Sequence, residues 1–66
     1  MLRTEIYYQL LHNPKLQGKI MFETGVTFST LTNWARGKKD RLERVQIIKI
    51  IADFLETTPE NLFNNN

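Results

Sequence analysis

Apolar residues recur at helical spacing along almost the whole chain. Leu2, Ile6 and Leu10 form one stripe, which predicts a first helix over residues 2–11. Further helices are predicted over residues 14–24, 28–36, 41–56 and 59–63. No run alternates apolar and polar positions as a half-buried strand would, so the pattern favours an all-α fold of five helices in a single domain, residues 1–66.

The stretch from Gln17 to Gly37 divides into two short helices with a tight turn between them. Gly25 follows an apolar run, and glycine just past a helix end readily takes the left-handed conformation. Thr27 stands where the cap of the next helix is expected, and Gly37 marks the end of that helix. The sequence therefore predicts a helix, a turn and a second helix in this order.

Three further start signals place the remaining helices. They are Asn13 with Pro14, Asp40 with Glu43 in the spacing of a capping box, and Thr58 with Pro59. The last three residues, Asn64 to Asn66, are expected to fray.

The predicted helix over residues 28–36 has two unlike faces. Leu31, Trp34 and Ala35 share one face at spacings of three and four, so we expect them to be buried. The opposite face has no carboxylate, and it carries Phe28, Ser29, Thr32, Asn33 and Arg36. Short hydrogen-bonding groups of this kind bind the edges of bases in the major groove of DNA.

With these residues the chain resembles a known family, the phage-repressor type of helix-turn-helix, also called the xenobiotic-response-element family. The resemblance rests on Gln17, Ile20, Gly25, Val26-Thr27, Ser29-Thr30-Leu31, Trp34 and Arg36-Gly37-Lys38. It continues through Ile51-Ala52-Asp53-Phe54-Leu55 and Thr58-Pro59-Glu60-Asn61-Leu62-Phe63. The resemblance implies a compact, lambda-repressor-like domain of five helices, whose second and third helices form the helix-turn-helix that binds double-stranded DNA.

The resemblance also implies which residues contact DNA. The expected base contacts are Phe28, Ser29, Thr32 and Asn33. An asparagine can bond adenine in two places at once, whereas Phe28 offers only apolar contact, for example to a thymine methyl group. The expected phosphate contacts are Gln17, Thr27, Arg36, Lys38, Lys39 and Arg41, of which Arg36 is a weaker candidate, as is Lys19.

Each of these residues also has a structural alternative. Phe28 would pack into the core or pin the start of its helix, and the polar and basic residues would form an ordinary solvated surface. Trp34 has the ring needed to stack on a nucleobase, but its spacing with Leu31 favours core packing.

The distribution of charge follows the motif. The net charge is only +2, but residues 17–44 carry six cations against three acids, whereas residues 45–66 carry one cation against three acids. A basic surface around the motif agrees with phosphate binding, and a solvated surface of mixed charge is the alternative.

The composition argues against several other classes of protein. The chain has no cysteine and a single histidine, His12, so we expect neither a disulfide framework nor a metal site. The sequence offers no nucleophile with its base, no glycine-rich phosphate loop and no paired carboxylates that share a plausible pocket. We therefore expect no enzyme and no cofactor. No apolar run approaches the roughly 20 residues that span a membrane, and we expect a cytoplasmic protein.

We therefore expect a sequence-specific regulator of transcription that acts as a repressor and binds double-stranded DNA as a homodimer. The candidates for the dimer interface are Ile47, Ile50, Phe54, Leu62 and Phe63, with completion of the core as the alternative. The alternative function is an antitoxin or a phage-type interaction module, which would use the same fold to bind a protein partner such as a toxin.

Overall fold

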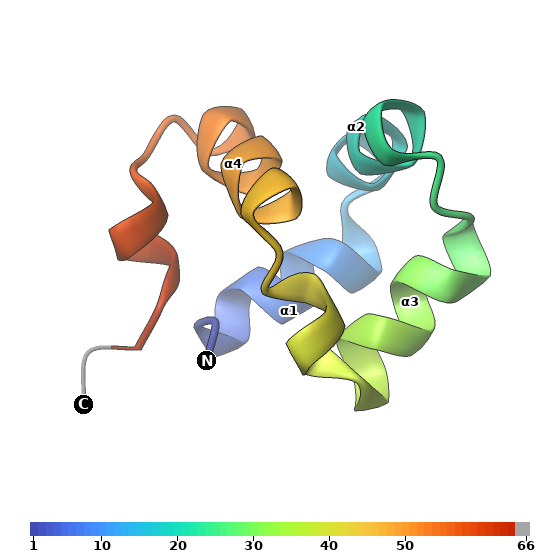
Figure 1. Ribbon diagram of the computed structural model, residues 1–66, viewed down its shortest axis with the longest axis horizontal. Helices are drawn as coiled ribbons and strands as arrows, with labels where there is room; N and C mark the ends of the chain where they lie inside the picture. The colour runs from blue at the N-terminus through green and yellow to red at the C-terminus, as the bar shows by residue number, and fades with distance from the viewer. Residues whose placement is uncertain (65–66) are drawn as a thin grey trace.

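The computed structural model describes residues 1–64, which form four α-helices and two short 3-10 helices (Figure 1). The α-helices are α1 (Thr4–His12), α2 (Pro14–Thr24), α3 (Phe28–Gly37) and α4 (Val45–Phe54). The 3-10 helices are η1 (Lys39–Leu42) and η2 (Pro59–Leu62). The only extended pairing within residues 1–64 is an isolated antiparallel bridge between Leu2 and Phe63, so the predicted all-α class is confirmed.

Local capping residues set the boundaries of α2 and α3. Asn13 Oδ1 accepts hydrogen bonds from the backbone N–H groups of Lys15 (3.1 Å) and Leu16 (3.3 Å) at the start of α2. Gly25 ends α2 in the left-handed conformation, with a φ of 77°. Thr27 Oγ1 accepts the backbone N–H three residues further on (3.3 Å) and so caps α3. Both helices therefore match their predicted ranges to within one residue.

The predicted helix over residues 41–56 is wrong at its start. The chain first forms η1, and α4 begins only at Val45, because Glu43 takes a backbone conformation outside the helical region (φ −87°, ψ 44°). Asp40 lies within η1, and no side chain caps α4, so the expected capping box is absent. The capping-box spacing here coincides with a short 3-10 turn instead of a helix start.

Three other predicted boundaries differ from the structure. α4 ends at Phe54, and Glu56 follows with a φ of +56°, which an α-helix cannot contain. The expected last helix is the 3-10 helix η2, to which Thr58 contributes no side-chain cap. The first helix begins at Thr4, because Leu2 instead pairs with the C-terminal segment.

α4 lies at the centre of the core, where it packs between α2 and η2. Its buried residues are Ile47, Ile48, Ile50, Ile51 and Ala52. Among the expected interface candidates, Ile47, Ile50 and Leu62 are buried in this core. Phe54 and Phe63 are partly buried and pack against it. Ile47, Ile50 and Leu62 therefore complete the core, whereas Phe54 and Phe63 keep part of their surface exposed.

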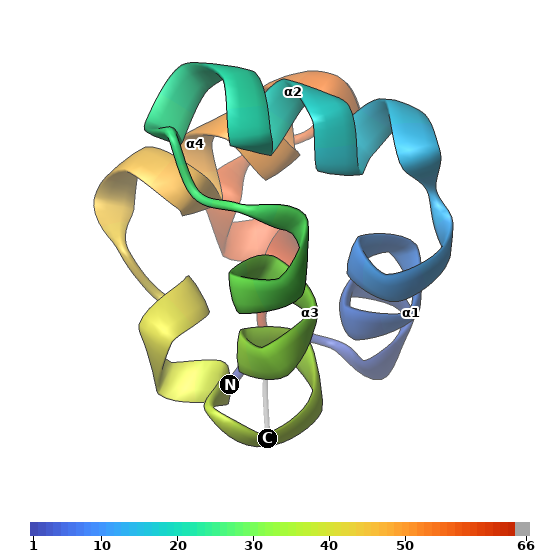
Figure 2. The same ribbon diagram turned by 90° about the vertical axis from the view of Figure 1, so that its right-hand side faces the viewer.

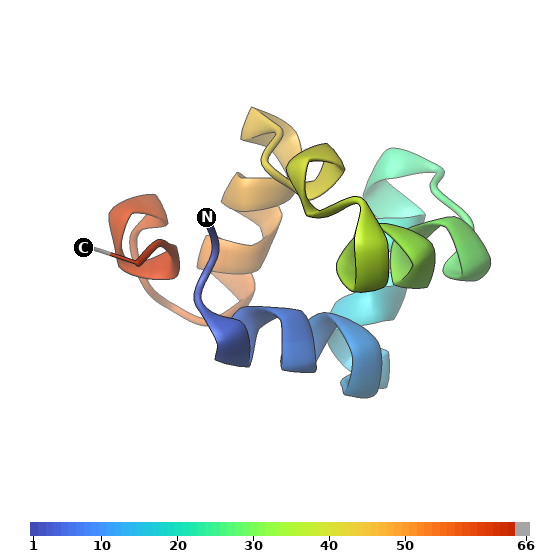
Figure 3. The same cartoon turned by 90° about the horizontal axis from the view of Figure 1, so that it is seen from below.

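The first and last described residues lie side by side (Figure 3). The Arg3 N–H donates to the carbonyl of Leu62 (2.8 Å), and the Asn64 N–H donates to the carbonyl of Met1 (3.1 Å). We call this pairing of residues 1–3 with residues 61–64 the terminal clip. The expected fraying is thus wrong at Asn64, while residues 65 and 66 lie outside the described part of the chain.

Candidate nucleic-acid interface

α3 lies on the side of the molecule that faces the viewer in Figure 2, where it packs against α1, α2 and η1. Hydrogen bonds within the short connection from α2 fix the start of this helix. The Val26 N–H donates to Thr24 Oγ1 (3.2 Å), and the Thr24 hydroxyl donates to the carbonyl of Ile20 (2.7 Å). The Thr27 hydroxyl donates to Thr30 Oγ1 (2.9 Å). The first turn of α3 therefore has a fixed position relative to the end of α2.

The two faces of α3 are divided largely as the sequence predicted. Leu31 and Ala35 are buried, and the partly buried Trp34 packs against the core beside them. Ser29 and Asn33 are exposed on the outer face, together with Arg36. Phe28 is 51% exposed at the first position of the helix, so the expectation that it could belong to the core does not hold. α3 thus presents an apolar ring and two small polar side chains to solvent.

Thr32 does not belong to this outer face. Its side chain is buried at 6% exposure, and its hydroxyl lies 3.1 Å from each of the carbonyl oxygens of Phe28 and Ser29, to which it can donate. Threonine hydroxyls within a helix often bond to the carbonyl of the preceding turn in this way. The expectation that Thr32 contacts a base is therefore corrected, since its side chain is turned toward the protein.

Gln17 is also buried, at 6% exposure, in the first half of α2. Its Nε2 donates to the carbonyl of Leu10 (2.8 Å), which joins α2 to the last turn of α1. A buried amide that is bonded to the backbone cannot reach a phosphate without breaking this bond. The expected phosphate contact from Gln17 is therefore replaced by a structural role, in which the side chain holds two helices together.

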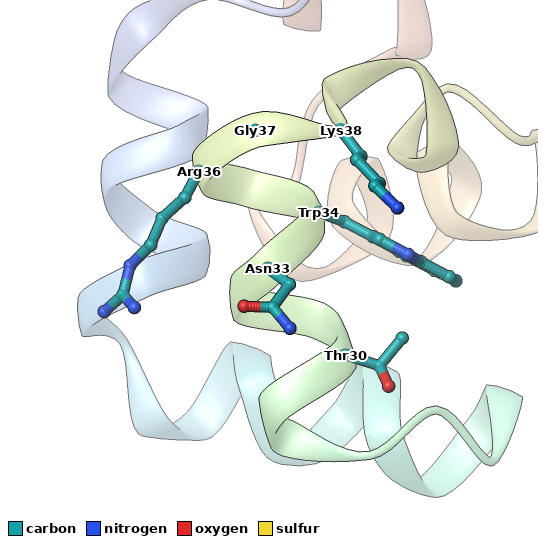
Figure 4. A pocket seen from close by; sticks show the side chains of 6 residues that line it. All are labelled: Thr30, Asn33, Trp34, Arg36, Gly37 and Lys38. Atoms are coloured by element: carbon teal, nitrogen blue, oxygen red, sulfur yellow. The ribbon is translucent and has the colours of Figure 1, made fainter.

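A shallow depression of about 490 Å³ runs along the C-terminal half of α3 (Figure 4). It is lined by Thr30, Asn33, Trp34, Arg36, Gly37 and Lys38. Figure 4 shows Asn33 near the middle, with Arg36 extending to one side and Trp34 and Lys38 on the other. The depression therefore combines an exposed amide with two cations and the edge of an aromatic ring.

The cations near α3 differ in what they contact. Arg36, Lys38 and Arg41 are exposed, and none of them forms an ion pair with another of residues 1–64. The Lys39 ammonium instead lies over the ring of Tyr7, 4.6 Å from its centre. Lys19 pairs with Glu23 at 3.1 Å. Arg36, Lys38 and Arg41 are thus the cations with the most freedom to bind an anion.

Sequence reasoning missed one cation close to this surface. The guanidinium carbon of Arg44 lies over the Trp34 ring, 5.4 Å from its centre, which is the arrangement of a cation–π contact. Arg44 immediately precedes α4 and belongs to the unforeseen break between η1 and α4. The basic composition of residues 17–44 was the one signal in the sequence that included it.

The described part of the chain offers neither a metal site nor a membrane-spanning helix. Among residues 1–64, no group of three or more His, Asp or Glu side chains is placed to hold a metal ion. The ring of the single histidine, His12, lies 4.5 Å from that of Tyr8. None of the described helices has the length and apolar character needed to cross a membrane.

Known proteins add no further information about the surface of α3. A comparison with protein-family models, with curated proteins and with solved structures found no match to this chain. The function must therefore be inferred from the residues and from their arrangement.

Proposed function

We propose that this protein is a sequence-specific double-stranded DNA-binding regulator of transcription that acts as a repressor. In this proposal α2, the connection 25–27 and α3 serve as a helix-turn-helix in a lambda-repressor-like domain, and α3 enters the major groove. The observation that carries the proposal is the outer face of α3. This face exposes Phe28, Ser29 and Asn33, has no carboxylate, and is followed by cations without ion-pair partners among the described residues.

The exposed side chains divide into two roles. Asn33 and Ser29 would bond base edges, and Phe28 would contact the methyl group of a thymine. Arg36, Lys38 and Arg41 would bind phosphates and so fix the position of the helix on the duplex. To bind a phosphate, Lys39 would have to leave the ring of Tyr7. The Thr27 hydroxyl would have to stop donating to Thr30. Gln17 and Thr32 are left out because both are buried.

We further propose that the protein binds as a homodimer to paired half-sites. One small domain contacts only a few base pairs, whereas two copies related by a two-fold axis would recognise a palindrome. The half-sites would then be separated by one helical turn of DNA, about 34–36 Å.

Selection from a pool of random duplexes at two salt concentrations tests this function directly. We expect a short palindrome to be enriched and its affinity to fall steeply as the salt concentration rises, because phosphate contacts release counterions. If no sequence is enriched, the proposed function is wrong, and co-purification with protein partners such as a toxin becomes the next experiment.

Two substitutions separate base recognition from phosphate binding. Asn33→Ala should lose about 1–3 kcal/mol on the selected site and relax the preference at one base pair. Lys38→Ala should weaken binding to all sequences alike and reduce the slope of log affinity against log salt by about 1. Asn64→Ala, in the terminal clip, is the control and should bind like the wild type. If the Asn33 and Lys38 variants behave identically on all duplexes, the assignment of the two roles is wrong.

A further inference from the structure

The Trp34 ring lies between the core and the charged surface of α3. It is partly buried and packs against the core cluster. The Trp34 carbonyl accepts the Lys38 N–H (3.1 Å), which fixes the point where the chain leaves α3. The guanidinium carbon of Arg44 lies over the ring, 5.4 Å from its centre. One aromatic ring therefore contacts both the core and a cation from a different segment of the chain.

Arg44 is restrained by this ring but is not neutralised. Its carbonyl accepts the Ile48 N–H (2.9 Å), so its backbone is fixed at the start of α4. Its side chain is exposed and forms no ion pair within residues 1–64, and the preceding residue, Glu43, lies 3.8 Å from the amino group of Met1 instead. A cation–π contact uses the charge of the guanidinium and leaves its N–H donors available to an anion.

Lys38 is a second cation on the same side of α3. Trp34 and Lys38 line the same depression, and Figure 4 shows both side chains extending to one side of Asn33. Lys38 is exposed and, like Arg44, has no ion-pair partner in the described part of the chain. Two such cations, on segments that meet at one ring, favour the binding of an anion such as a DNA phosphate.

We propose that Trp34 is a positioning residue, which holds Arg44 where it joins Lys38 in binding the phosphate backbone of DNA. Trp34 itself contacts no base in this proposal. A side chain that is restrained in advance loses less entropy on binding than one that must first be ordered. The inference rests on the proposed function because its ligand is duplex DNA, but it requires no recognition of sequence.

Binding to a duplex of arbitrary sequence at several salt concentrations tests the role of Arg44. Arg44→Ala should weaken binding and reduce the slope of log affinity against log salt by about 1, because one phosphate contact is lost. Lys49→Ala is the matched control and should keep the wild-type slope. Lys49 is an exposed cation of α4 that lines a hollow with Pro59 and Phe63, and η2 lies on the opposite side of the molecule from α3 in Figure 1.

The outcomes separate this inference from the proposed function. A wild type that binds this duplex but enriches no sequence from a random pool overturns the proposed function alone. An Arg44→Ala variant that keeps the wild-type slope, while the wild type enriches a palindrome, overturns this inference alone. A wild type that binds no duplex at all overturns both.

Substitutions of Trp34 on the same duplex test the positioning role. Trp34→Leu should weaken binding about 2- to 10-fold and keep most of the slope, because Arg44 can still reach a phosphate but must first be ordered. Trp34→Phe retains an aromatic face and should recover most of this loss. In a chain that already carries Arg44→Ala, Trp34→Leu should cause no further loss. An equal loss with and without Arg44 would mean that Trp34 only supports the fold, and the positioning role would be wrong.

A measurement without DNA tests whether Arg44 lies at the ring in solution. Trp34 is the only tryptophan of the chain, so its fluorescence reports on this contact. The charge of Arg44 should concentrate iodide near the ring, so Arg44→Ala should lower quenching by iodide about twofold relative to quenching by neutral acrylamide. Lys49→Ala should leave this ratio unchanged. An unchanged ratio in Arg44→Ala overturns the proposal, even if the Trp34 variants fail to fold.

Discussion

Tyr7 shows how a single side chain can be well packed and yet poorly bonded. Tyr7 lies on α1, its ring is buried in the core, and the Lys39 ammonium lies over that ring. Its hydroxyl is buried as well, but it has no hydrogen-bond partner among the described residues. Burial raises the pKa of the Tyr7 hydroxyl above its usual value of 10.0, because the ionised form would lose its hydration. The backbone of Leu2 offsets a part of this rise, but no hydrogen bond of normal geometry within residues 1–64 satisfies the hydroxyl.

Tyr7→Phe should therefore keep or increase the free energy of unfolding, by up to about 1 kcal/mol. Stability of the wild type should also fall as the pH rises above about 10, because Tyr7 ionises in the unfolded chain while the folded protein keeps its proton. The Tyr7→Phe variant should lose this part of the alkaline decline. Urea denaturation at several pH values between about 8 and 11 measures both effects.

Tyr8→Phe serves as the control for this experiment. Tyr8 is 62% exposed, so removing its hydroxyl should change the free energy of unfolding by less than about 0.5 kcal/mol. A Tyr7→Phe variant that is destabilised by more than about 1 kcal/mol would mean that the hydroxyl is bonded in the folded protein.

At the scale of the helices, local chemistry decides some boundaries and tertiary packing decides others. The ends of α2 and the start of α3 depend on Asn13, Gly25 and Thr27, each of which acts within a few residues of its own position. These capping signals can be recognised in the sequence because they need no distant partner. α1 begins later than its apolar stripe predicted, because Leu2 is used in pairing with Phe63, at the opposite end of the described chain.

The same distinction explains which site residues the sequence could identify. Ser29 and Asn33 follow from the helical period alone, and both are exposed. The same period also predicts Thr32 on the outer face, and the resemblance implies a phosphate contact for Gln17. Each of these two side chains instead has a carbonyl within hydrogen-bonding distance inside the protein, and no local pattern indicates such a partner. Arg44, which lies over Trp34, belongs to the break before α4, where the sequence predicts a continuous helix instead.

Thr27→Ala should lower the free energy of unfolding by about 1 kcal/mol, because the N–H at the start of α3 loses its acceptor. Thr58→Ala is the matched control, since Thr58 precedes η2 without capping it and its loss should change stability by less than about 0.5 kcal/mol. Urea denaturation in the absence of DNA measures both variants. Equal losses in the two variants would show that the hydrogen bond of Thr27 contributes nothing to stability.

At the scale of the whole molecule, the small core depends on segments from both ends of the chain. Leu2 and Leu62 are each 1% exposed, and they are brought together by the terminal clip. A chain of this length buries only about 60% of the surface that its unfolded form exposes. Its stability is therefore modest, and the contacts made by the last turn form part of it.

Leu62→Ala should lower the free energy of unfolding by about 2–5 kcal/mol, because it leaves a cavity in a fully packed site. Thermal unfolding should remain a single transition at a lower temperature, since η2 and α4 share one core. Phe22→Ala removes a larger side chain that is 90% exposed, and it should change stability by less than about 0.5 kcal/mol. A Leu62→Ala variant as stable as this control would mean that η2 is dispensable.

The terminal clip also determines how the molecule would respond to tension. Its two segments run antiparallel, so Met1 lies opposite Asn64 and Arg3 lies opposite Leu62. A force that pulls residues 1 and 64 apart would first load the hydrogen bond between Asn64 and Met1. The bond between Arg3 and Leu62 would carry the load only after the first bond has broken. The bonds would open one at a time, as in unzipping, instead of resisting together in shear. A pull on residues 1 and 64 would therefore open the terminal clip at low force, and Leu2 and Leu62 would be exposed first.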